Sequence, residues 1–108
     1  MIYTIIVESA ARADINEVFE WMEENLTNEI AVQWYFDIYS AIDSLQTMPL
    51  RCGLARENIF FKEEIRQLLC GKYRILFEAD KNQVRVLHVR HASRQTLKPE
   101  RPKQEKKR

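Results

Sequence analysis

Glycine, proline and cysteine are scarce in this sequence, whose 108 residues include two glycines, three prolines and two cysteines. The two glycines lie far apart, so the chain has no glycine-rich phosphate-binding loop. Cys52 and Cys70, together with His88 and His91, lack the paired spacing of a zinc site. The sequence therefore predicts neither a metal site nor a bound cofactor.

Long apolar runs are also missing, since none approaches the roughly twenty residues that span a bilayer. The chain begins without the charged and then apolar leader of a secretory signal. We therefore expect a cytoplasmic protein with no membrane association, whose cysteines stay reduced. Residues 1–97 are expected to form one domain. Residues 98–108, KPERPKQEKKR, carry six bases and no large apolar side chain, which predicts a disordered tail.

Acids and bases are segregated along the chain. Residues 1–50 contain nine acids and one base, residues 51–97 contain ten bases and five acids, and the tail contains six bases and two acids. A basic second half is suited to phosphate or to an acidic protein segment, whereas the acidic first half would repel nucleic acid. The acidic half is equally consistent with the solvated face of a helix pair.

The first half of the sequence predicts one strand and two helices. Residues 2–7, IYTIIV, are β-branched and aromatic, which is typical of a buried strand. Apolar residues at helical spacing predict a helix over 10–25, and a second helix that Thr27 or Asn28 caps and Pro49 closes. The short connection between them predicts an antiparallel helical hairpin.

The second half predicts a small sheet. Residues 50–58 show no period and predict a loop, and strand-like runs follow at 64–69, 73–79 and 84–89. Their connections are too short for crossover helices, so these strands should form antiparallel hairpins. The expected fold is α+β, in the order β-α-α-β-β-β, with the helices on one face of the sheet.

The last hairpin places the residues that could carry chemistry. A turn at 81–82 sets Arg74 opposite Val89, because antiparallel partners keep a constant index sum. Side-chain alternation then puts Arg74 and His91 diagonally next to each other on the face that the helices leave open. His88 falls on the helix side, where we expect a core histidine bonded to backbone.

An imidazole beside guanidinium groups is suited to a phosphodiester. His91 could transfer a proton near neutral pH, while Arg74 holds phosphate oxygens and the charge of the transition state. We therefore name Arg74 and His91 as candidate catalytic residues, and Arg85, Arg90 and Arg94 as candidate substrate- or partner-binding residues. Basic side chains at a sheet edge also occur without any such role.

Two segments of the chain resemble the RelE/ParE superfamily of toxin-antitoxin toxins. They are GKYRILF at Gly71–Phe77 and VLHVRH at Val86–His91, and the resemblance spans about residues 2–97. It implies a small cytoplasmic growth inhibitor of the plasmid-stabilisation type, silenced in a hetero-oligomer by a cognate antitoxin protein.

The resemblance implies two possible targets. RelE-like members cleave mRNA on the ribosome without a metal, and Arg74 and His91 match their catalytic positions, although Ala92 stands where an aromatic residue follows the histidine. ParE-like members poison DNA gyrase by binding it, and the long helical hairpin and the Arg-rich strand end favour this branch. A third alternative is a non-toxic module that only binds an antitoxin.

Overall fold

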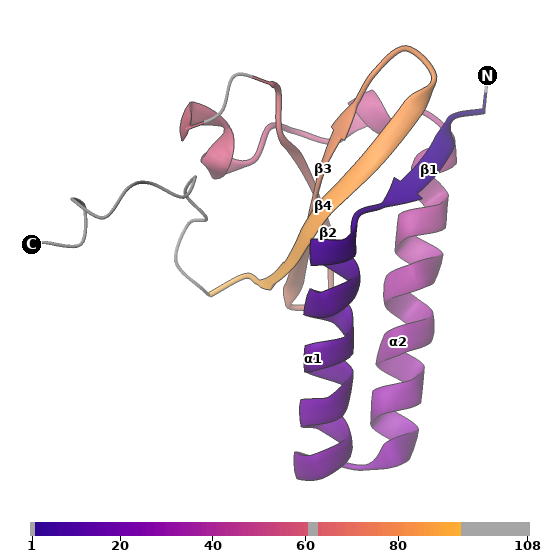
Figure 1. Cartoon of the computed structure of the whole chain (residues 1–108), viewed down its shortest axis with the longest axis vertical. Coiled ribbons are helices and arrows are strands. Elements are labelled where there is room, and N and C mark those ends of the chain that lie inside the picture. Colours follow the sequence, from indigo (N-terminus) through magenta and orange to yellow (C-terminus); the bar gives the residue numbers. More distant parts are fainter. Residues whose placement is uncertain (1, 61–62, 94–108) are drawn as a thin grey trace, which may run out of the picture.

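The computed structural model describes residues 2–60 and 63–93. Its elements are β1 (Thr4–Val7), α1 (Ser9–Asn25), α2 (Asn28–Asp43), the short 3₁₀ helices η1 (Ser44–Gln46), η2 (Pro49–Arg51) and η3 (Arg56–Phe60), β2 (Arg66–Cys70), β3 (Tyr73–Ala79) and β4 (Gln83–His91) (Figure 1). The predicted α+β order is confirmed. The predicted tail at 98–108 lies outside the described residues.

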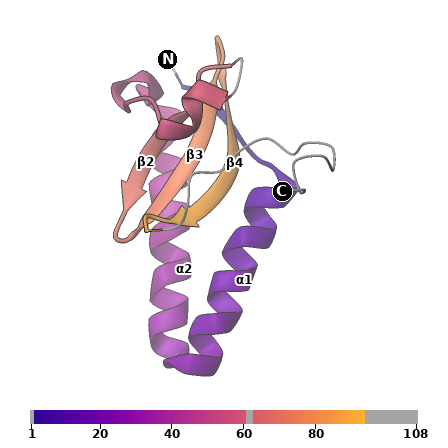
Figure 2. The same ribbon diagram turned by 90° about the vertical axis from the view of Figure 1, so that its left-hand side faces the viewer.

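The two helices form the predicted antiparallel hairpin. Thr27 caps α2, because its Oγ1 accepts a hydrogen bond from the Ile30 backbone N–H at 3.1 Å. One stripe of each helix is buried against the sheet or the other helix: Ala11, Ile15 and Met22 in α1, and Ala31, Ile38 and Ile42 in α2. The far end of the hairpin extends beyond the sheet (Figure 2), where Leu26 and Ile30 are about half exposed.

The sheet has four strands in the order β1-β4-β3-β2. The three predicted strands pair antiparallel, and β1 adds a parallel strand beside β4. Since β1 pairs only with Gln83–Val86, it covers the first half of the outer edge of β4. The second half of that edge runs alongside α1 instead.

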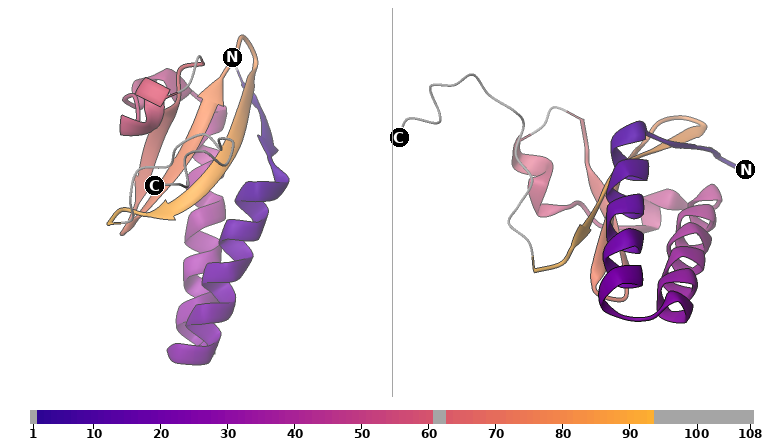
Figure 3. Two further views of the ribbon diagram at one scale, coloured as in Figure 1. Left: turned by 60° about the vertical axis from the view of Figure 1, so that its left-hand side comes forward. Right: turned by 60° about the horizontal axis from the view of Figure 1, so that its bottom comes forward.

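The second face of the sheet is covered, although we expected the helices to leave it open. On the first face, Ile75, Phe77, Val84, Val86 and Val89 pack with α1 and α2. On the second face, Ala55, Ile65 and Leu76 form a smaller buried cluster with Leu87. Figure 3 shows η3 on the side of the sheet opposite to the helices. The predicted loop at 50–58 thus contains two 3₁₀ turns and acts as a cover.

The register of the last hairpin is correct at the turn and wrong beyond it. The Asp80 N–H donates to the Gln83 carbonyl at 2.9 Å, and Phe77 pairs with Val86 as predicted. A β-bulge follows, in which Leu87 has no partner on β3. Every later pair is displaced by one residue: Leu76 with His88, Ile75 with Val89, Arg74 with Arg90, and Tyr73 with His91. The predicted pairing of Arg74 with Val89 is therefore wrong.

Candidate functional site

Arg74 is buried in a closed ion pair on the second face. Its Nη1 and Nη2 donate to the two carboxylate oxygens of Glu57 at 2.8 and 2.6 Å, and Nη1 also reaches Gln67 Oε1 at 3.1 Å. The side chains of Arg74 and Glu57 are 4% and 0% exposed. A two-point contact of this kind satisfies the charge of both groups inside the protein. Arg74 in this position has no surface on which to receive a phosphate.

His91 lies on the other face. Because it pairs with Tyr73, it shares the helix side of the sheet, and its ring centroid is 5.1 Å from that of Tyr73. Its Nδ1 accepts a hydrogen bond from the Ser93 N–H at 3.1 Å, so in this arrangement the ring proton is on Nε2. The predicted adjacency of Arg74 and His91 is therefore wrong. Their catalytic assignment stays a prediction without that geometric support.

His88 is a half-buried partner of a carboxylate, so the expectation of a core histidine bonded to backbone is wrong. Its Nδ1 lies 3.0 Å from Asp14 Oδ2, and the same oxygen accepts the Val89 backbone N–H at 2.9 Å. Asp14 belongs to α1, which runs along the part of β4 that β1 leaves uncovered. The carboxylate therefore ties α1 to this edge of the sheet.

The three candidate binding arginines are spread over the strand and its continuation. Arg85 lies near the start of β4, where it contacts Glu8 Oε2 at 3.2 Å and Glu78 Oε2 at 3.7 Å. Arg90 pairs with Arg74 and shares the second face. Arg94 lies outside the described residues. The structure therefore does not bring Arg85 and Arg90 into one site.

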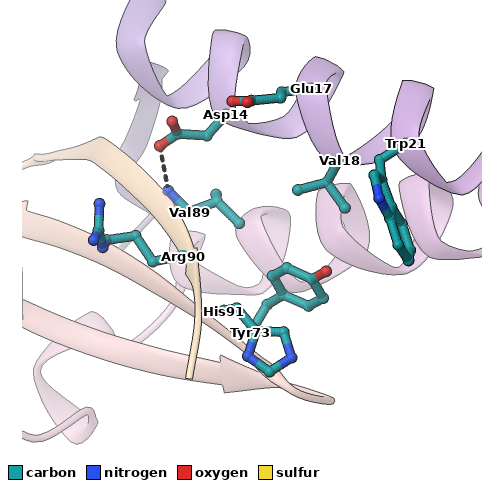
Figure 4. A pocket seen from close by; sticks show the side chains of 8 residues that line it. All are labelled: Asp14, Glu17, Val18, Trp21, Tyr73, Val89, Arg90 and His91. Atoms are coloured by element: carbon teal, nitrogen blue, oxygen red, sulfur yellow. Dashed lines mark hydrogen bonds between the residues drawn. The ribbon is translucent and has the colours of Figure 1, made fainter. Parts of the chain in front are cut away.

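A cleft of about 210 Å³ lies between α1 and the ends of β3 and β4 (Figure 4). One wall is a stripe along α1 and the other is formed by the strand ends, and the lining residues are Asp14, Glu17, Val18, Trp21, Tyr73, Val89, Arg90 and His91. Trp21 is 54% exposed although it is aromatic. Figure 4 shows the Arg90 side chain extending away from Trp21. The carboxylates and Trp21 lie on α1, and Tyr73 lies on the opposite wall of the cleft (Figure 4).

Among the residues that the structure describes, four groups have a pKa that is shifted upward. Burial raises the pKa of the Cys52 and Cys70 thiols, and it also raises the pKa of Tyr39. Burial, followed by the negative charge of Glu63, raises the pKa of Glu78. A raised thiol pKa lowers the fraction of reactive thiolate, so neither cysteine is activated as a nucleophile.

Within residues 2–60 and 63–93, no group of three or more His, Cys, Asp or Glu side chains is placed to hold a metal ion. Over the same ranges, no helix combines the length and the apolar character needed to cross a membrane.

Two residues of the site, Glu57 and Asp14, were missed at the sequence level. Glu57 falls in a stretch without periodicity, so no pattern placed it beneath the sheet. Asp14 stands among the acids of α1, and nothing local distinguishes it from those that face solvent.

The sequence profile of the ParE toxin of the type II toxin-antitoxin system parDE matches residues 5–96. The chain belongs to this family, and the predicted superfamily is confirmed. No sequence match was found among curated proteins.

Solved structures share the fold. A chain from the chromosomal ParDE system of P. aeruginosa superposes with a TM-score of 0.73 and 16% identity, covering 85% of this chain and 98% of that one. A chain of the RelBE2 toxin-antitoxin complex from Mycobacterium tuberculosis gives a TM-score of 0.54 and 25% identity, covering 84% and 99%. The archaeal RelE–RelB complex from Pyrococcus horikoshii OT3 contributes a third chain, with a TM-score of 0.56, 12% identity, and coverage of 88% and 100%.

Proposed function

We propose that this toxin stops growth by binding DNA gyrase, as ParE-like members of its superfamily do, and not by cutting mRNA. The observation that supports this choice is the closed pair of Arg74 and Glu57, with side chains 4% and 0% exposed. The RelE-like reaction needs the guanidinium of Arg74 to reach a phosphate. Releasing it would break a buried, bidentate ion pair, and breaking such a pair costs about 3–5 kcal/mol.

A second argument comes from charge. The helical hairpin carries eight of the sixteen acids of the chain and no base except Arg12, and its outer end extends beyond the sheet (Figure 2). Such a projection would be repelled by ribosomal RNA, but it can dock against a protein surface. Several large apolar side chains are also exposed on it, namely Trp21, Leu26, Ile30, Val32 and Phe36. Exposed apolar groups of this size are typical of protein–protein contact surfaces.

The partner that silences the toxin is proposed to be a cognate antitoxin protein. The three similar structures are described as toxin-antitoxin systems or complexes, which supports this assignment. The exposed apolar side chains of the hairpin give such a partner a surface to cover. We expect the chain to accumulate in cells only when the antitoxin is made with it.

Cleavage of mRNA is the alternative, and two observations favour it. The highest of the three identities, 25%, is to a chain of the RelBE2 complex. His91 is also only partly buried at the rim of the cleft, where an imidazole could exchange protons with a bound nucleotide.

The test is a gyrase supercoiling reaction with the purified full-length chain, run beside a purified translation reaction. The proposal predicts lost supercoiling and intact mRNA. The matched variant is the double substitution Glu57→Leu with Arg74→Met, which removes the guanidinium without leaving a buried charge. It should inhibit gyrase within about twofold of the parent, because the buried pair does not touch the target. Normal supercoiling together with cleaved message would overturn the proposal. Growth unaffected by expression of the chain alone would favour a non-toxic binding module.

A further inference from the structure

The cleft between α1 and the strand ends has the chemistry of a cation site. Glu17 faces it from α1 and has no hydrogen-bond or ion-pair partner among the described residues, whereas Asp14 already accepts His88 and Val89. Trp21 and Tyr73 add aromatic faces to the same cleft. A guanidinium or ammonium group between an aromatic face and a carboxylate gains both a cation–π contact and an ion pair.

The bases near the cleft do not cancel this character. Arg90 pairs with Arg74 on the second face, and its side chain extends away from Trp21 (Figure 4). His91 Nδ1 is occupied by a hydrogen bond from the Ser93 backbone N–H at 3.1 Å. The cleft therefore presents a carboxylate and aromatic rings to whatever enters it.

A cationic segment begins directly beside the cleft. His91 is part of the cleft wall, and the chain continues through Ser93 into residues 94–108, which contain seven bases and two acids. We infer that this C-terminal segment docks in cis on the α1 cleft, with an arginine or lysine between Glu17 and Trp21. The segment is tethered within a few residues of its site, so its effective concentration there is high.

A second acidic cleft offers a competing site, and its position argues against it. Glu63, Glu64, Glu78 and Asp80 line it together with Arg85. It lies at the start of β4, roughly 25 Å from His91 if each strand residue advances about 3.3 Å. It also contains its own cation, because Arg85 contacts Glu78. The α1 cleft is therefore the nearer site, with its carboxylate still available.

Docking has a consequence for partners. A segment lying between Glu17 and Trp21 covers part of the exposed apolar surface of the hairpin. Any protein that uses the Trp21 side of α1 must then displace it. The inference holds whichever cellular target the toxin has, because the contact lies within one chain.

The test follows the Trp21 indole N–H resonance in the full-length chain by NMR. Raising the salt from about 20 mM to 500 mM should screen the contact and shift this resonance. The triple variant Lys98→Gln, Arg101→Gln, Lys103→Gln should show the high-salt position already at low salt. Removing three of the bases that could occupy the site should lower the docked-to-undocked ratio several-fold.

A matched pair of α1 variants separates loss of docking from any effect of the substitution on folding. Glu17→Gln changes an exposed residue that lines the cleft, and it should abolish most of the salt-dependent shift. Glu20→Gln changes an exposed acid of the same helix that does not line the cleft, and it should leave the shift intact. Equal behaviour of the two variants would overturn the inference.

Three other results would also overturn it. A Trp21 resonance that changes neither with salt nor with the tail substitutions would show that the contact does not form. Salt-dependent shifts at Ala79–Gln83 in place of Trp21 would assign the segment to the second acidic cleft. A Trp21 shift that grows with protein concentration would assign the docked segment to a second copy of the chain.

Discussion

Breaking the Arg74–Glu57 pair should destabilise the fold far more than removing the pair altogether. The pair is bidentate, at 2.8 and 2.6 Å, and almost fully buried. Glu57→Leu leaves the Arg74 guanidinium buried with Gln67 as its remaining side-chain acceptor among the described residues, and a buried charge that loses its ion-pair partner costs about 3–5 kcal/mol. Arg74→Met removes the guanidinium from the buried Glu57 carboxylate and should destabilise the fold by a similar amount. The double variant buries two apolar side chains and should lie within about 1 kcal/mol of the parent.

Urea unfolding measures this cycle directly. With a slope of about 1.5 kcal/mol/M for a domain of this size, each single variant should lose about 2–3 M in its midpoint. The coupling energy of the cycle should then exceed about 3 kcal/mol. Glu64→Gln is the control, because its pair with Arg66 is exposed on the Glu64 side, at 69%, and should cost less than about 1 kcal/mol. Single variants as mild as this control, or a double variant as unstable as the two singles combined, would refute the reasoning.

Three further predictions concern separate parts of the chain. Because the pKa of Glu78 is raised in the fold, its negative charge opposes folding at neutral pH. Glu78→Gln should therefore be more stable than the parent at pH 7, and the difference should vanish below pH 4.5. Urea midpoints that differ equally at both pH values would contradict this prediction. Thr27→Ala removes the cap on the Ile30 N–H and should cost about 1 kcal/mol by the same assay, whereas an unchanged midpoint would show that the cap adds nothing. Cys52 and Cys70 should react with a disulfide reagent at pH 7.5 more slowly than free cysteine does. Cys52, which is 8% exposed, should be the slower of the two, and fast labelling of Cys52 would contradict its burial.

Most elements of the fold could be predicted because their signals are local. The helices show apolar stripes at the helical period, and Thr27 is a residue type that commonly caps helices. The turn at 81–82 fixed the first pairs of the last hairpin correctly. The parallel partnership of β1 with β4 depends on contacts between the two ends of the chain, and no local pattern carries that information.

The β-bulge is the point at which the predicted site failed, and the sequence contains a weak sign of it. Along β4 the outward polar residues are Arg85, His88 and Arg90, which change phase between the first and the second. A prediction that assumes strict alternation misses this change and places His91 on the wrong face. The reason is that a shift of one residue moves every later side chain of the strand to the opposite face. The break in the alternation of polar residues along β4 therefore marks the position of the bulge.

The cover over the second face could not be predicted. Residues 50–58 lack a period, and the packing of the cover depends on contacts of Ala55 and Ile65 with Leu76. The ion pair between Glu57 and Arg74 spans seventeen positions of sequence and leaves no spacing to recognise. Because this cover buries Arg74, the open phosphate site predicted from the sequence is not present in the structure.

The most direct test of the proposed activity compares DNA and RNA from one culture that expresses the full-length chain without its antitoxin. The supercoiling of a reporter plasmid and the integrity of a reporter message are measured on the same samples. Binding to gyrase predicts a relaxed plasmid and a full-length message as growth stops. A plasmid that stays supercoiled while the message is cut within its coding region would contradict the proposal and return Arg74 and His91 to consideration as catalytic residues.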